Sequence, residues 1–270
     1  MTQCLIAIGC NQGDCQAAIN QACKKINLLP STQLLATSGL LKTEPVGPLK
    51  GTFLNGAVLV ETQLSPHQLL QYLLELEFAA GRRRSGSVDA RPLDLDILLF
   101  GEEIIHTQAL WVPHPRMAFR RFALHPAAEI AADMQHPEIG ISLGRLAEHL
   151  RQRPNIIAVS LPRQFAIDTT DMNLSGEINW VNPQNAIAAR KLLQIPASST
   201  AEWLVLLIQD AQTLATTEAQ AKLRIVMSAP GDSLQTPFAN TWAGPLWNIP
   251  FGNQAQLYEQ IMTAIQAMTS

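Results

Sequence analysis

The sequence has no apolar run long enough to cross a membrane, which takes about 20 consecutive apolar residues. Its N-terminal segment has no basic leader and no small-residue cleavage site, so it is not typical of a signal peptide. The net charge of −3 gives no indication of binding to nucleic acid or to a membrane surface. We therefore expect a cytoplasmic protein with no nucleic-acid partner and no membrane partner.

Cysteine is scarce, and all four cysteines lie in the first 23 residues. They form no CxxC pair, which argues against a zinc site, and a disulfide framework would be spread more widely along the chain. We therefore predict that Cys4, Cys10, Cys15 and Cys23 are reduced structural thiols. The sequence also has no G-x-x-x-x-G-K-[ST] phosphate loop.

Charge is spread unevenly along the chain. Residues 1–160 hold 14 Lys/Arg and 14 Asp/Glu, whereas residues 161–270 hold 5 and 8. Half of the basic residues in the first part are arginines that lie close together in sequence: Arg82, Arg83, Arg84, Arg91, Arg116, Arg120 and Arg121. Such a cluster is typical either of a site for an anion such as a polyphosphate or of a solvated surface. Composition alone leaves both alternatives open.

The hydrophobic pattern of the first half predicts alternating strands and helices. We expect strands at 4–9, 34–43, 53–62 and 90–101, and helices at 15–29 and 66–81. The resulting order β-α-β-β-α-β is that of a ferredoxin-like α+β sandwich, a mostly antiparallel sheet with flanking helices. A further turn and helix at 133–150 is expected to complete this domain.

Two prolines and a polar stretch around residues 154–165 predict a domain boundary. We place the domains at 1–158 and 159–270. The second domain is expected to be a smaller α/β domain of uncertain fold, with helices at 183–193 and 253–268, a strand at 223–227 and an apolar run at 203–208. We interpret it as a structural appendage of unknown function, through which the chain could form homo-oligomers.

The segment ARPLDLDILLFG (residues 90–101) places two carboxylates in alternate positions of a predicted strand. Asp94 and Asp96 therefore point to one face, whereas Leu93 and Leu95 point to the other. Adjacent carboxylates repel each other unless a cation lies between them. Mg²⁺ suits such a pair, because it prefers oxygen ligands and is often shared with substrate phosphates. Ion pairs with neighbouring arginines remain an alternative.

The same segment resembles the signature of the 6-hydroxymethyl-7,8-dihydropterin pyrophosphokinase family. Four further segments, in the same order and spacing, are similar to that family: IAIGCNQGD (6–14), KTEPVG (42–47), FLNGAVLVET (53–62) and VPHPRMAFRRFALHPAAEIA (112–131), the last as the late loop of the family. The resemblance covers about residues 3–150, with Cys10 where relatives usually have Ser. It implies transfer of the pyrophosphoryl group of ATP to the pterin in tetrahydrofolate biosynthesis, with release of AMP.

The resemblance also implies a role for individual residues. The catalytic residues would be Arg82, Arg91, Asp94, Asp96 and Arg120, with Asp94 and Asp96 holding two Mg²⁺ ions. The pterin would contact Thr43, Pro45, Val46, Phe53, Asn55 and Phe122, with its flat ring between the two aromatic side chains. ATP would contact Glu77, Arg82, Arg84, Arg91, Ile97, His114 and Arg120.

Two other hypotheses remain open. The first is a different Mg²⁺-dependent transferase with a DxD motif, such as a nucleotidyl or glycosyl transferase. The set of Phe53, Asn55 and Phe122 argues against it, because those reactions need no aromatic sandwich. The second is a degenerate module that binds pterin or nucleotide without turnover, which pterin binding without AMP formation would identify.

Overall fold

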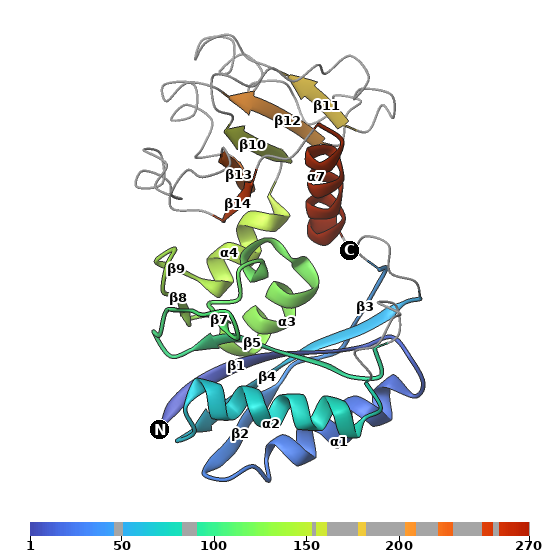
Figure 1. Cartoon of the computed structure of the whole chain (residues 1–270), viewed down its shortest axis with the longest axis vertical. Coiled ribbons are helices and arrows are strands. Elements are labelled where there is room, and N and C mark those ends of the chain that lie inside the picture. Colours follow the sequence, from blue (N-terminus) through green and yellow to red (C-terminus); the bar gives the residue numbers. More distant parts are fainter. Residues whose placement is uncertain are drawn as a thin grey trace. The chain divides into compact units, whose positions relative to one another are not determined.

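The computed structural model describes residues 1–45, 51–82, 91–152, 155–160, 178–181, 203–208, 221–228, 245–250 and 254–269. The chain divides into two compact units (Figure 1). The first consists of Met1–Ala147 with Thr263–Ser270, and the second consists of Glu148–Met262. Strand β10 (Ile156–Ser160) has residues on both sides of the predicted boundary at 158/159, which stays a prediction.

The first unit starts with the predicted alternation of strands and helices. Its elements are β1 (Thr2–Cys10), α1 (Cys15–Ile26), β2 (Thr32–Thr37), β3 (Leu41–Thr43), β4 (Phe53–Thr62), α2 (Pro66–Ala79) and β5 (Asp94–Phe100). The single strand predicted at 34–43 is wrong, because β2 and β3 are separate strands. The ladder is interrupted at residues 38–40: Ser38 N still donates to Ala57 O (3.0 Å), but Ala57 N donates to the Ser38 hydroxyl (2.8 Å) rather than to a backbone carbonyl.

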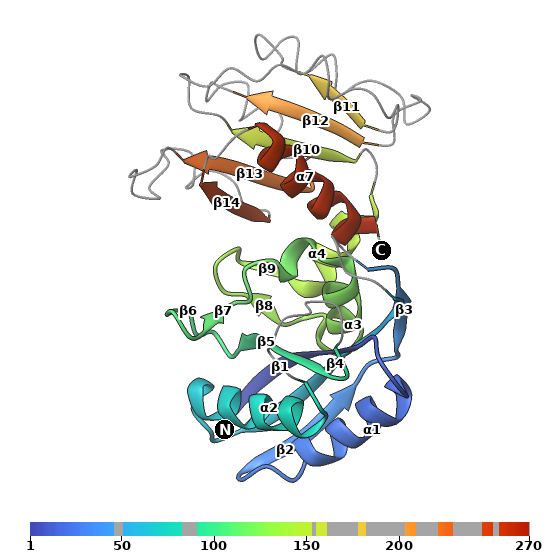
Figure 2. The same ribbon diagram turned by 45° about the vertical axis from the view of Figure 1, so that its right-hand side comes forward.

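The strand order of the first sheet is β2-β4-β1-β5, and β3 pairs with β4. All of these pairs are antiparallel. Figures 1 and 2 show α1 and α2 together on one face of this sheet. The core on this face contains Ile8 of β1, Ile19 of α1 and Leu69 of α2, and both Leu93 and Leu95 belong to it. The predicted mixed α/β architecture with an antiparallel sheet and flanking helices is therefore confirmed.

The two helices begin where the sequence provides caps. The carboxylate of Asp14 accepts a hydrogen bond from Ala17 N (3.0 Å) and caps α1. At the start of α2, Ser65 and Gln68 form a reciprocal capping box, with Pro66 as the first helical residue. These caps fix the ends of the loops that lead from β1 to α1 and from β4 to α2.

The chain after β5 contains several short elements. They are β6 (Ile105–His106), β7 (Trp111–Val112), the 3₁₀ helix η1 (Met117–Phe119), α3 (Arg121–Ala131), β8 (Gln135–His136), β9 (Ile141–Ser142) and α4 (Leu143–Arg151). Helix α3 corrects the expectation of a loop through residue 131. Pro126 lies inside this helix and masked its signal in the sequence, although Leu124 and Ala127 are buried. Of the turn and helix expected at 133–150, α4 forms the second part and a β8–β9 hairpin precedes it.

The second unit has a five-stranded parallel sheet with the order β11-β12-β10-β13-β14. Besides β10, its elements are β11 (Ile178–Val181), β12 (Trp203–Ile208), β13 (Leu223–Ser228), β14 (Leu246–Pro250) and α7 (Gln254–Thr269), whose last residues belong to the first unit. The strand expected at 223–227 and the closing helix are confirmed, and the apolar run at 203–208 forms β12. The helix expected at 183–193 lies outside the described residues.

The prediction that all four cysteines are reduced is wrong, because Cys10 and Cys15 form a disulfide. Gly13, at a φ of 78° that favours glycine, turns the chain between them and brings their Cα atoms to 5.4 Å. Cys4 and Cys23 are free, and burial raises the pKa of both thiols. Among the described residues, no helix is both long and apolar enough to cross a membrane.

Candidate active site

The face of the first sheet opposite α1 and α2 carries the predicted polar residues. In the strand register, Gly9 of β1 lies between Asn55 of β4 and Asp94 of β5, and Ala7 pairs with Asp96. Direct cross-strand partners point to the same face of a sheet. Asn55, Asp94 and Asp96 therefore share this face, as the alternation in the sequence predicts.

Gly9 leaves the space that these side chains need. A Cβ at this position would lie 2.9 Å from Asn55 Oδ1 and 3.8 Å from Asp94 Cβ, and the first distance is too short for an unmoved neighbour. The sequence analysis did not identify Gly9. The signal it passed over is the pair of small residues, Ala7 and Gly9, at alternate positions of an otherwise bulky strand.

Asp94 forms ion pairs with two arginines. Arg82 Nη1 lies 2.5 Å from Asp94 Oδ1, and Arg91 Nη1 lies 2.7 Å from Asp94 Oδ2. The ion-pair alternative is therefore observed at this carboxylate. Each carboxylate oxygen has a second lone pair, so it can accept from a guanidinium and still bind a cation.

Glu77 holds Arg82 from the other side. Its carboxylate is almost fully buried, forms an ion pair with Arg82, and accepts a hydrogen bond from Leu95 N (2.7 Å). Burial raises the pKa of Glu77, whereas the Leu95 N–H and the Arg82 charge act in the opposite direction. Glu77 thus links the end of α2 to the start of β5 and orients Arg82 toward Asp94.

Asp96 differs from Asp94 because its side chain is exposed to solvent. Surrounding protein atoms nevertheless displace part of its hydration. This loss raises the pKa of Asp96, the negative charge of Asp94 raises it further, and the charges of Arg120, Arg82 and Arg91 oppose both effects. A cation between the two carboxylates would relieve their repulsion.

Two further arginines crowd this carboxylate pair. Burial, together with the positive charges of Arg116 and Arg91, lowers the pKa of Arg120 to about 10, despite the nearby carboxylates. Burial and Arg91 also lower the pKa of Arg116. The sequence analysis counted Arg116 in the arginine cluster but gave it no role, although it lies four positions before Arg120. Such mutual repulsion is relieved by a polyanion.

His114 lies beside these arginines and remains neutral. Burial and the charges of Arg120 and Arg116 lower its pKa to about 3. Its Nδ1 accepts a hydrogen bond from Arg116 N (3.3 Å), and its backbone N–H donates to Leu98 O (2.9 Å). The Ile97 side chain is buried in the core under α1 and α2, so it does not face the polar side of the sheet.

The predicted pterin residues surround the start of β4. Asn55 Nδ2 donates to Thr43 Oγ1 (2.9 Å), and both side chains are buried. Phe53 is buried as well and is the register partner of Thr43. The guanidinium carbon of Arg120 lies 5.5 Å from the centre of the Phe122 ring, a cation–π contact that joins the pterin and phosphate sets.

The described contacts bring most of the predicted residues together. Arg82, Arg91 and Glu77 meet around Asp94, whereas Thr43 meets Asn55. The predicted Val46 and Arg84 lie outside the described residues, and Pro45 is the last described residue before that gap. The aromatic sandwich of Phe53 and Phe122 stays a prediction.

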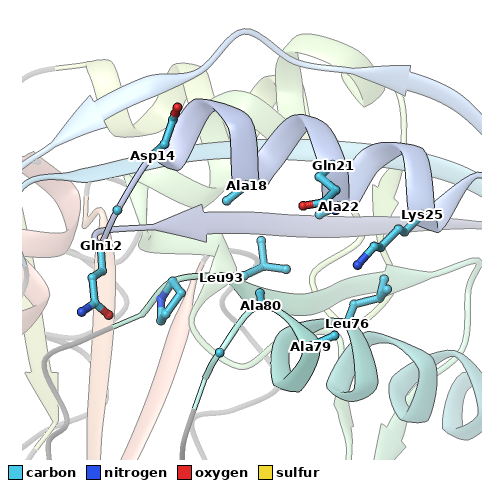
Figure 3. Close-up of a pocket in the computed structure, with 13 residues that line it drawn as sticks. Gln12, Asp14, Ala18, Gln21, Ala22, Lys25, Leu76, Ala79, Ala80 and Leu93 are labelled. Carbon is cyan, nitrogen blue, oxygen red and sulfur yellow. The ribbon is translucent and has the colours of Figure 1, made fainter.

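A cavity of about 640 Å³ lies between α1 and α2, on the other face of β5 (Figure 3). It is lined by the loop Gln12–Asp14, by Lys25 of α1, by Leu76 of α2 and by Leu93. Leu93 faces this cavity, whereas Asp94 faces the polar side of the sheet. The cavity is therefore separate from the predicted site.

The donor set fits Mg²⁺ bound together with a substrate. Among the described residues, no group of three or more His, Cys, Asp and Glu side chains could hold a metal by itself. Mg²⁺ is commonly bound by one or two carboxylates together with waters and substrate phosphates. Asp94 and Asp96 supply hard oxygen donors of this kind on one face of β5.

Comparisons with known proteins match the first half of the chain. A family model described as 7,8-dihydro-6-hydroxymethylpterin-pyrophosphokinase (HPPK) matches residues 5–132. A 2-amino-4-hydroxy-6-hydroxymethyldihydropteridine pyrophosphokinase of Pseudomonas aeruginosa is 39% identical over 134 residues, which are 49% of this chain and 83% of the relative. The protein of that name from Haemophilus influenzae is 39% identical over 138 residues, 51% and 86% of the two chains.

A solved structure described as the HPPK-DHPS in complex with substrates is similar at a TM-score of 0.45 and 9% identity. The match covers 99% of this chain and 81% of that chain.

Proposed function

Because this chain belongs to the 7,8-dihydro-6-hydroxymethylpterin-pyrophosphokinase family, we infer that it catalyses ATP-dependent pyrophosphoryl transfer to 6-hydroxymethyl-7,8-dihydropterin in folate biosynthesis. One observation supports this function above the others. Asp94 and Asp96 lie on one face of β5, beside Asn55 and next to a group of crowded arginines. This arrangement supports a polyphosphate site beside a site for a polar ring.

In this reaction the hydroxymethyl oxygen of the pterin attacks the β-phosphorus of ATP. A new O–P bond forms, the bond from the β-phosphorus to the oxygen that bridges it to the α-phosphorus breaks, and AMP leaves. The hydroxyl proton is lost. Phosphoryl transfer of this kind depends mainly on positioning and charge stabilisation rather than on a protein nucleophile.

The arginines would neutralise the phosphates. In the structure, Arg82 and Arg91 each pair with Asp94. Their remaining N–H groups could donate to the oxygens of a bound triphosphate. Burial and the positive charges of Arg116 and Arg91 lower the pKa of Arg120, so a nearby anion would stabilise its charged form. We add Arg116 to the predicted phosphate contacts for the same reason.

We propose that Asp94 and Asp96 hold two Mg²⁺ ions. When bound, Mg²⁺ supplies charge neutralisation and alignment of the polyphosphate. The chain contributes hard oxygen donors, and Glu77 contributes indirectly because it fixes Arg82.

The pterin would lie over the start of β4. Asn55 can offer an acceptor and a donor to the edge of the ring, and its hydrogen bond to Thr43 fixes its amide orientation. Phe53 and Phe122 would cover the two faces of the ring. The contact of Arg120 with Phe122 would place the acceptor hydroxyl near the phosphate set.

We further propose that the first sheet is ferredoxin-like, which its strand order and connections support. Residues 1–158 would form the pyrophosphokinase domain, and 159–270 an appended α/β domain through which the chain forms homo-oligomers.

The function is tested by measuring AMP release from ATP with the pterin and Mg²⁺ present. AMP should form only when all three are supplied together. AMP formation without pterin would indicate an ATPase instead. Pterin binding without AMP would favour the degenerate binding module.

A further inference from the structure

The loop between Cys10 and Cys15 holds the backbone of Arg91. Asn11 N donates to Arg91 O (3.0 Å), and Arg91 N donates to Asn11 Oδ1 (2.7 Å). The guanidinium of Arg91 in turn lies 2.7 Å from Asp94. Asn11 thus fixes both backbone polar groups of a residue whose side chain reaches the carboxylate site.

The disulfide fixes the two ends of this loop. Cys10 is the last residue of β1, Cys15 is the first residue of α1, and Asn11 directly follows Cys10. The loop also approaches the pterin side, because a Cβ at Gly51 would lie 3.8 Å from Asn11 O. A change in the conformation of the Cys10–Cys15 loop would therefore affect both the carboxylate site and the predicted pterin site.

The loop has space on its other side. Gln12, Gly13 and Asp14 line the cavity between α1 and α2, and Figure 3 shows Gln12 and Asp14 at its edge, where α1 begins. A loop that faces a cavity can move without displacing packed side chains. The disulfide and the two bonds to Arg91 are therefore important restraints on Asn11.

We propose, on the premise of the function above, that Asn11 is a positioning residue for Arg91, and that the Cys10–Cys15 disulfide makes this positioning redox-sensitive. Reduction frees the loop, weakens the two hydrogen bonds between Asn11 and Arg91, and lowers the rate of pyrophosphoryl transfer. Oxidation restores the disulfide and the rate.

The redox step is a thiol–disulfide exchange with a small-molecule disulfide such as oxidised glutathione. The thiolate of Cys15 attacks that disulfide, forms a mixed disulfide and expels one thiol. The thiolate of Cys10 then attacks Cys15 Sγ and expels the second thiol. The two cysteines lose two protons and two electrons, and the oxidant becomes two thiols. A dithiol reverses the sequence.

Cys15 is the cysteine that reacts first in this scheme. It is partly exposed, whereas Cys10 is fully buried. It is also the first residue of a 12-residue helix, where the backbone N–H groups stabilise a thiolate.

The test compares the whole protein in its oxidised form and after treatment with dithiothreitol, with the disulfide checked by thiol titration. Reduction should lower kcat/KM for ATP about tenfold, as expected when a phosphate-binding guanidinium is misplaced. Reoxidation with oxidised glutathione should restore the activity. A Cys23→Ser variant, which removes another cysteine of α1, should keep the full response.

Variants separate positioning from mere stability. Cys15→Ser should have the activity of the reduced protein under both conditions. Asn11→Ala should still form the disulfide but lose the redox response. In an Arg91→Ala background, Asn11→Ala should have no further effect, because it acts through Arg91.

Binding of a non-hydrolysable ATP analogue with Mg²⁺ distinguishes the two proposals. An oxidised protein that makes no AMP but loses about tenfold affinity for the analogue on reduction would overturn the function and support the positioning. Equal AMP formation in both redox states, with the change of the disulfide verified, would overturn the positioning and leave the function standing. An inactive protein with equal affinity in both states would overturn both.

Discussion

The two sheets of this chain bury their strands differently. In the first sheet, burial alternates over the first residues of β5, so that Leu95 is buried under the helices while Asp94 and Asp96 reach the opposite face. In the second sheet, consecutive residues Ile156–Val159 and Val205–Leu207 are all fully buried. An antiparallel sheet can leave one face for chemistry, whereas a parallel sheet covered on both faces cannot. The polar residues on the open face of the first sheet can therefore contact a ligand, whereas the consecutive residues at the centres of β10 and β12 are buried.

Two charged residues of the second unit are buried. Lys222 is buried, and its amine donates to the backbone carbonyl of Leu150. Arg224 is fully buried in β13. In parallel α/β sheets, ligands bind outside the carboxyl ends of the strands. The chain that follows β10, β12 and β13 lies outside the described residues.

The largest expected effect comes from the polar face of the first sheet. Asp96→Ala should lower AMP formation about 10³-fold, since it removes half of the carboxylate pair and its contribution to charge stabilisation. Unfolding by urea should show equal or slightly higher stability, because the repulsion from Asp94 is lost. Glu103→Ala, an exposed carboxylate beyond β5, is the control and should change neither. Retained activity in the Asp96 variant would contradict a catalytic role for the polar face of the first sheet.

The second sheet should show the reverse pattern. Leu206→Ala in β12 removes a fully buried side chain and should lower the free energy of unfolding by about 3–4 kcal/mol. At a temperature where the protein is folded, kcat/KM should not change. Leu28→Ala, at a leucine with 80% exposure, should cost almost nothing in the same urea titration. A fall in activity with Leu206→Ala beyond the unfolded fraction would give this sheet a catalytic role.

Low pH should reduce the stability of the first unit through protonation of its buried histidines. Burial lowers the pKa of His136 to about 4, from an ordinary value of 6.5. The unfolded chain therefore binds a proton before the folded chain does, and stability falls as the pH drops from about 6.5 toward 4, by about 3 kcal/mol for this group. His136→Gln should flatten that part of the stability curve, as measured by urea unfolding at a series of pH values. An unchanged slope would contradict the assignment.

Gly9→Ala tests the space between the pterin and carboxylate groups. Its new Cβ would approach Asn55 Oδ1 to 2.9 Å and displace the amide. We expect KM for the pterin to rise about tenfold, through loss of one well-placed hydrogen bond. Gly39→Ala is the matched control, because its Cβ would lie 3.6 Å from the Glu129 carboxylate and has room. Steady-state kinetics with either substrate varied would show the difference, and an unchanged KM would remove Asn55 from the pterin site.

The same contrast explains what the sequence could predict. The period of two in ARPLDLDILLFG predicted which residues of β5 face the site, since alternation is a local property. The runs that form β12 and β13 indicated no chemistry, because apolar residues dominate both. Helix α3 was missed because Pro126 obscured its pattern. The role of Arg116 and the Cys10–Cys15 disulfide depend on where distant or turning segments meet, which periodicity does not report.

The most direct test follows the two terminal phosphates of ATP. ATP labelled separately at the β- and γ-phosphorus would be incubated with the pterin, Mg²⁺ and either the wild-type protein or Asp96→Ala. The account predicts that the wild-type protein transfers both labels together to the pterin, that AMP carries neither, and that the variant transfers almost none. Transfer of the γ label alone, or equal transfer by the variant, would contradict the account of the carboxylate face.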